Sequence, residues 1–91
     1  MSATVRIPTI LRSYTKGESD VTAEGATVRA VLADLDGRYP GIAARVLDDN
    51  GEVRRFVNVY LNDDDIRFLD GLDSAIPDRA MISIIPAVAG G

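Results

Sequence analysis

One amphipathic helix with strand-like segments before and after it limits the folds open to this chain more than any other feature. Across residues 28–39 the apolar side chains recur at intervals of three and four, so they form one face of an α-helix. Thr27 is the expected N-cap, and Gly37 together with Pro40-Gly41 is expected to end the helix. Because such a helix buries only one side, a sheet must cover it.

Two strands are expected before the helix. Alternating apolar and polar residues predict a strand over residues 4–11, and because Pro8 falls late in it we expect a position near a sheet edge, or a bulge. Turn-forming residues follow at 15–18, and residues 20–24 alternate again. These two segments predict a hairpin.

The second half of the chain predicts three more extended segments. Residues 42–51 carry only a weak apolar pattern, and we expect a surface excursion there. The clearest alternation covers residues 53–61, followed by a turn and a short strand around Ile66 and Phe68. A final strand is expected over residues 81–85.

Strands on both sides of a single helix predict an α+β domain in which a mixed sheet of four to five strands packs on one main α-helix. The last strand should lie beside the first and parallel to it, which is the β-grasp, or ubiquitin-like, arrangement. We place this domain at residues 1–86. Pro86 stops ladder pairing, so residues 87–91 are expected to form an exposed, flexible C-terminal tail.

The residue types present exclude most catalytic chemistry. The 91 residues include no cysteine and no histidine, which removes disulfides, thiol nucleophiles, the usual zinc sites and imidazole bases. The net charge of −4 argues against nucleic acid and favours a basic protein surface as the partner. No segment approaches the ~20 apolar residues of a membrane span, so we expect no membrane association and a cytoplasmic location.

Two charged clusters have competing interpretations. Asp63, Asp64 and Asp65 could suggest a metal site, but adjacent carboxylates point in alternating directions and lack the spacing of a calcium loop, so we interpret them as a solvated turn. Arg54 and Arg55 could bind an acidic partner or keep the start of a strand soluble, and the second interpretation is favoured.

The closing residues offer a specific chemistry. Glycine has no Cβ, so Gly90 and Gly91 can thread a narrow channel and present an unhindered acyl carbon. A carboxylate becomes an acceptor only when its oxygen is made a leaving group, so a partner must adenylate it with ATP. The alternative is an ordinary frayed chain end, and the pattern alone leaves both open. The segment expected to enter partner active sites comprises Ala87, Val88, Ala89 and Gly90.

Ile85 and Pro86 are the expected docking residues because they adjoin this tail. With Phe56 and Phe68, Ile85 either forms an exposed apolar patch or lies beneath the excursion at residues 42–51, and alternation allows both.

Three stretches carry a family resemblance: VRIPTILR at residues 5–12, FVNVYLNDDDI at 56–66 and PAVAGG at 86–91. Over nearly its whole length the chain resembles the ubiquitin-like sulfur carriers of the MoaD/ThiS family, and within it the carriers of cysteine biosynthesis. The final diglycine is the most specific of the three features.

The resemblance implies a protein substrate rather than an enzyme, with no bound cofactor. An E1-like enzyme would adenylate the Gly91 carboxylate with ATP and convert it to a thiocarboxylate. The sulfur would then add to an aminoacrylate on a pyridoxal-phosphate (PLP)-dependent cysteine synthase, and a metal-dependent peptidase would release the cysteine left on Gly91. The alternatives are the small subunit of molybdopterin synthase, a sulfur donor for another thio-metabolite, and a non-covalent β-grasp interaction module.

Overall fold

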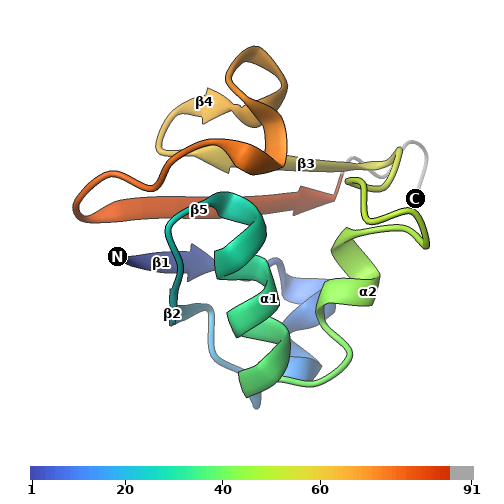
Figure 1. The fold of residues 1–91 in the computed structure, drawn as a ribbon. Helices are drawn as coiled ribbons and strands as arrows, with labels where there is room; N and C mark the ends of the chain where they lie inside the picture. The colour runs from blue at the N-terminus through green and yellow to red at the C-terminus, as the bar shows by residue number, and fades with distance from the viewer. Residues whose placement is uncertain (87–91) are drawn as a thin grey trace.

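The computed structural model describes residues 1–86; residues 87–91 lie outside the described part. The strands are β1 (Ser2–Arg6), β2 (Asp20–Glu24), β3 (Val57–Leu61), β4 (Asp64–Asp65) and β5 (Ala80–Pro86) (Figure 1). The α-helices are α1 (Val28–Arg38) and α2 (Ala43–Val46), and the 3-10 helices are η1 (Thr9–Thr15), η2 (Ile66–Phe68) and η3 (Gly71–Asp73). Within residues 1–86, no helix has the length and apolar character needed to cross a membrane.

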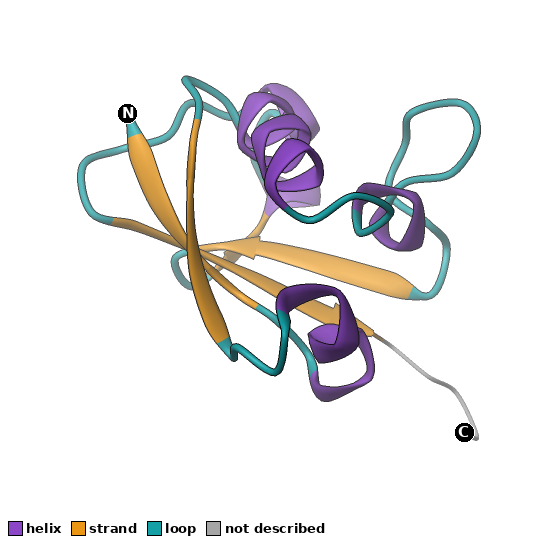
Figure 2. Ribbon diagram, turned by 90° about the horizontal axis from the view of Figure 1, so that it is seen from below, coloured by secondary structure: helices purple, strands orange, loops and turns teal. Residues whose placement is uncertain are grey.

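The five strands form one mixed sheet in the order β2-β1-β5-β3-β4. β1 and β5 run parallel, with Val5 opposite Ile82, and every other neighbouring pair is antiparallel. α1 covers one face of this sheet (Figures 1 and 2). This is the β-grasp fold, as the sequence predicts, with β5 at the centre of the sheet.

The main helix begins and ends for local reasons. The backbone N–H of Ala30 donates to the Thr27 hydroxyl at 3.2 Å, which confirms Thr27 as the N-cap. Gly37 was expected to help end the helix, but it lies inside it, so that part of the prediction was wrong. The helix ends at Arg38, and Pro40 follows two residues later.

The core lies between α1 and the sheet. The buried face of α1 consists of Val28, Val31, Leu32 and Leu35. The sheet contributes alternate residues of its inner strands, namely Ala3, Val5, Val59, Leu61, Ala80, Ile82 and Ile84. The alternation seen in the sequence therefore gives the correct buried face of each of these strands.

The first strand ends at Arg6 rather than at Leu11, so the predicted length was wrong. Ile7 still bonds to Ser19, but Pro8 has no N–H to continue the ladder, and the chain turns into η1. β1 is not itself an edge strand, because it lies between β2 and β5, but it is next to the edge strand β2, which agrees with the predicted position near a sheet edge. The antiparallel pairing of the predicted hairpin is confirmed.

The region after α1 is not a surface excursion throughout. Ile42 and Val46 are fully buried and dock the short helix α2 onto the core. The exposed residues are Ala44 and Arg45 on the outer side of α2 and those of the following turn, where Asp48 accepts the backbone N–H groups of Asn50 and Glu52. A four-residue helix is too short to produce a readable period.

Asp65 also departs from its predicted role. The short strand comes before Ile66 rather than around it, and residues 66–68 form η2. Asp65 is only 7% exposed and accepts the backbone N–H of Arg67 at 2.8 Å, so it caps η2 and is not a solvated turn residue. Across residues 1–86 no group of three side chains is placed to hold a metal ion.

Candidate functional site

The central strand β5 leads directly toward the predicted reactive segment. Its parallel neighbour β1 accompanies it only as far as Ser83, which lies opposite Arg6. The antiparallel neighbour β3 continues to the end, with Val57 opposite Pro86. The last three residues of β5 therefore have a strand on one side and η1 on the other.

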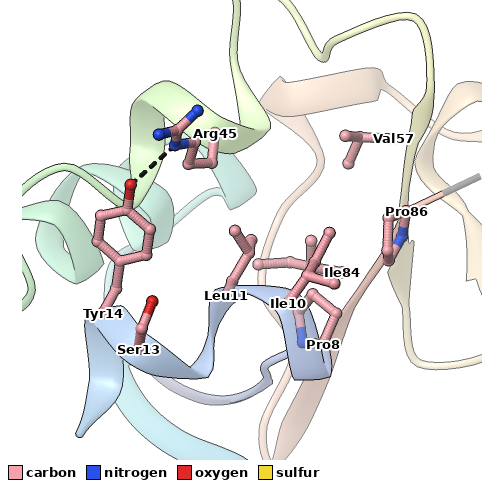
Figure 3. Close-up of a pocket in the computed structure, with 9 residues that line it drawn as sticks. All are labelled: Pro8, Ile10, Leu11, Ser13, Tyr14, Arg45, Val57, Ile84 and Pro86. Carbon is pink, nitrogen blue, oxygen red and sulfur yellow. Dashed lines mark hydrogen bonds between the residues drawn. The ribbon is translucent and has the colours of Figure 1, made fainter. Parts of the chain in front are cut away.

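Two open grooves flank this end of β5, one on each side of η1. The groove in Figure 3 is lined by Pro8, Ile10, Leu11, Ser13, Tyr14, Arg45, Val57, Ile84 and Pro86. The other is lined by Arg6, Ile7, Pro8, Thr9, Ile10, Arg12, Ser83, Ile84, Ile85 and Pro86. Pro8, Ile10, Ile84 and Pro86 belong to both linings, so the two grooves adjoin along these residues. Among residues 1–86, no acidic residue belongs to either lining.

The expected docking residues are accessible. Ile85 is 46% exposed on the face of β5 opposite to the core, and Pro86 is half-buried. Phe56 and Phe68 are also exposed, so a position for these side chains beneath residues 42–51 is wrong. Ile10, which is 65% exposed, was missed because it was assigned to the first strand; the signal for its exposure was Pro8.

Arg45 at the rim of the first groove is held by an aromatic neighbour, which sequence reasoning also missed. Its Nε donates to the Tyr14 hydroxyl at 2.8 Å, and its guanidinium carbon lies 5.9 Å from the ring centroid (Figure 3). The hydrogen bond to Tyr14 raises the pKa of Arg45, so the side chain keeps its charge. Tyr14 and Arg45 come from η1 and α2, and only the tertiary fold brings them together.

Gly91 and the threading segment of residues 87–90 lie outside the described residues. Their proposed roles remain predictions. The structure places the strand that precedes them, both grooves and the exposed docking residues.

A β-grasp domain whose central strand leads toward Gly90-Gly91 defines a ubiquitin-like protein. The sequence matches the ThiS family over residues 5–91, and the chain belongs to that family.

Similar proteins agree with this assignment. The sulfur carrier protein CysO of Mycobacterium tuberculosis is 50% identical over 93 residues, which cover 100% of both chains. Among solved structures, the Amycolatopsis orientalis BexX/CysO complex contains a chain with a TM-score of 0.91 and 48% identity, covering 98% of this chain and 99% of the other. The crystal structure of M. tuberculosis CysO gives a TM-score of 0.90 at 49% identity and covers 94% and 99%. The resemblance inferred from the sequence is therefore confirmed.

Proposed function

We propose that this chain is a sulfur carrier protein of cysteine biosynthesis, acted on by other enzymes. The observation that carries the proposal is the 50% identity to CysO, which extends from end to end of both chains. The fold supports it, because β5 is fixed by neighbours on both sides and leads toward Gly91.

The reactive group is the Gly91 carboxylate. Its oxygen attacks the α-phosphorus of ATP on an E1-like enzyme, and pyrophosphate leaves. A sulfur nucleophile supplied by that enzyme system then displaces AMP from the acyl carbon, which leaves a thiocarboxylate. The five residues after Pro86 span at most about 17 Å when extended, which sets how far a partner's active site can lie from its docking surface.

Two further enzymes complete the route. The thiocarboxylate sulfur adds to the aminoacrylate of a PLP-dependent cysteine synthase, and an acyl shift from sulfur to nitrogen leaves cysteine amide-linked to Gly91. A metal-dependent peptidase hydrolyses that amide. The carrier supplies the acyl group, while Ile85 and Pro86 are the proposed contacts that seat it on each partner.

Intact mass spectrometry of the protein isolated from its native cell tests the proposal. The mass should correspond to a chain ending at Gly91, with a fraction in which one oxygen is replaced by sulfur and a fraction carrying one added cysteine residue. Stable binding to a molybdopterin synthase large subunit, without the cysteine adduct, would favour the small-subunit alternative. An unmodified carboxylate in every growth condition would refute a carrier function.

Deletion of Gly91 provides the matched variant. It should abolish sulfur loading and leave the melting temperature nearly unchanged, because the core lies in residues 1–86. Gly37→Ala is the control: within residues 1–86 a Cβ at Gly37 meets no atom closer than 4 Å, and sulfur loading should be normal.

A further inference from the structure

The charge around the end of β5 is opposite in sign to that of the whole chain. Four stretches meet there, at residues 7–15, 43–47, 53–57 and 83–86, and together they contain four arginines and no acidic residue, although the chain has 14 acids and a net charge of −4. Residues 62–73 hold five aspartates and one arginine, and their net charge of −4 equals that of the whole protein. The loop at residues 48–52, between two of the four stretches, holds Asp48, Asp49 and Glu52.

Three of these arginines are held in place by neutral acceptors. Arg12 Nε donates to the Ile7 carbonyl at 3.1 Å, and Arg54 Nε donates to the Ala44 carbonyl at 2.8 Å. Arg45 Nε is bound by the Tyr14 hydroxyl. Within residues 1–86 none of the three forms an ion pair, in contrast to the arginines that do, namely Arg6, Arg29, Arg38 and Arg67.

This arrangement fixes each side chain through Nε and leaves its two terminal nitrogens available. Those nitrogens form the fork that binds a carboxylate in bidentate fashion. Arg55 is exposed beside Arg54 and adds a fourth charge. We call Arg12, Arg45, Arg54 and Arg55 the arginine collar.

Two of the acids that flank α2 in sequence are already engaged in local turns. Asp36 accepts the backbone N–H groups of Gly41 and Ala43, at 3.0 and 3.1 Å. Asp48 accepts two backbone N–H groups of its own turn. Among the described residues no carboxylate, including those of Asp49 and Glu52, forms an ion pair with an arginine of the collar, so no salt bridge neutralises the collar's positive charge.

Exposed apolar side chains lie within the same region. Ile10 of η1 is 65% exposed, and Ile85 of β5 is 46% exposed. Phe56, just before β3, is 59% exposed. Apolar anchors surrounded by arginine are the composition of protein–protein interfaces. A nucleic acid would meet this small collar but also the acidic excess of the chain, so a protein is the better fit.

We propose that the arginine collar is the ionic rim of the docking surface, and that each partner that receives the Gly91 end carries carboxylates around the mouth of its channel. This inference rests on the proposed function and specifies the chemistry of its partners. The local distribution of charge points to an acidic partner surface at this site, whereas the net charge alone favoured a basic one.

Steady-state kinetics with the E1-like enzyme of the native organism test the proposal. The Michaelis constant for the carrier is measured by ATP–pyrophosphate exchange at several NaCl concentrations. The variant is Arg12→Gln/Arg45→Gln/Arg54→Gln, and Arg29→Gln is the control, because Arg29 pairs with Asp73 and lines neither groove. Melting temperatures establish that both variants fold.

The triple variant should raise KM roughly tenfold with kcat unchanged, since each rim contact contributes modestly, and it should flatten the rise of KM with salt. Arg29→Gln should behave like the unaltered chain. Equal KM and salt dependence in the two variants would overturn the proposal, as would a larger effect from Asp63→Asn/Asp70→Asn in the acidic segment. If the collar proposal fails while the unaltered chain is still loaded with sulfur at Gly91, the carrier function itself stands.

Discussion

The clasp between Asp65 and Arg67 gives the sharpest prediction for stability. The Asp65 side chain is 8% exposed and accepts the Arg67 backbone N–H at 2.8 Å and the Arg67 guanidinium at 2.8 Å from Nη2. Arg67 Nη2 also donates to the Asn58 side chain at 2.7 Å, so the clasp joins η2 to β3. Asp65→Asn keeps the size of the side chain and removes its charge.

The expected loss follows from the bonds that change. Hydrogen bonds to a charged group contribute about 1.5–3 kcal/mol, against about 0.5–1.5 for neutral pairs. An asparagine oxygen can still accept the Arg67 N–H, and the Arg67 side chain is 66% exposed, which screens the ion pair. We therefore expect a loss of about 1–2 kcal/mol in the free energy of unfolding, or about 5–10 °C in melting temperature for a domain of this size.

The loss should depend on pH with a definite sign. The hydrogen bonds from Arg67 hold the pKa of the Asp65 carboxyl below its ordinary value of 3.8. A carboxyl whose pKa is lower in the folded state contributes stability above its unfolded pKa, and that contribution disappears as pH falls through the folded pKa. The difference between the native protein and Asp65→Asn should therefore be full above about pH 5 and shrink below about pH 4.

Urea denaturation followed by circular dichroism, near neutrality and at about pH 3, measures both effects. Asp63→Asn is the control, because Asp63 is exposed and forms no hydrogen bond through its side chain within residues 1–86. The reasoning is refuted if the two variants lose equal stability, or if the loss at Asp65 persists undiminished in acid.

Three further substitutions test the core and the helix entry by the same denaturation assay. Thr27→Ala removes the bond to the Ala30 N–H and should cost about 1 kcal/mol, whereas no measurable loss would exclude a capping role. Gly25→Ala places a Cβ 2.6 Å from the Val31 backbone nitrogen and should cost about 1–3 kcal/mol through forced backbone movement; an unaffected or stabilised variant would contradict this close approach. Ile42→Ala should cost about 2–5 kcal/mol because this side chain is fully buried. A loss below about 1 kcal/mol would support the surface excursion predicted from the sequence.

Long, regular patterns were predictable from the sequence. The apolar period of the main helix and the alternation in β5 each extend over several residues, and the Thr27 cap marks the start of the helix. These signals placed the helix, its buried face and the inner face of the last strand correctly. From these, the topological rules for strands around one helix yielded the β-grasp arrangement.

Features that depend on tertiary contacts were not predictable. Residues 9–15 continue an apolar pattern past Pro8, yet the missing N–H diverts them into η1. Asp65 looks like its exposed neighbours in the sequence, but it caps η2 and binds the Arg67 guanidinium, which also reaches Asn58 of β3. The two grooves and the collar arginines likewise combine segments distant in sequence. The roles predicted for residues 87–91 rest on the chemistry of the diglycine and on the family resemblance.

The position of β5 at the centre of the sheet has a mechanical consequence. A force applied to the end of this strand loads the ladders to β1 and β3 together, because the strand lies between them. Hydrogen bonds arranged side by side along the direction of pull share the load, whereas those at a sheet edge peel one after another. An enzyme that pulls on the C-terminal end of the chain therefore applies its force to a strand that is hydrogen-bonded on both sides and resists unfolding.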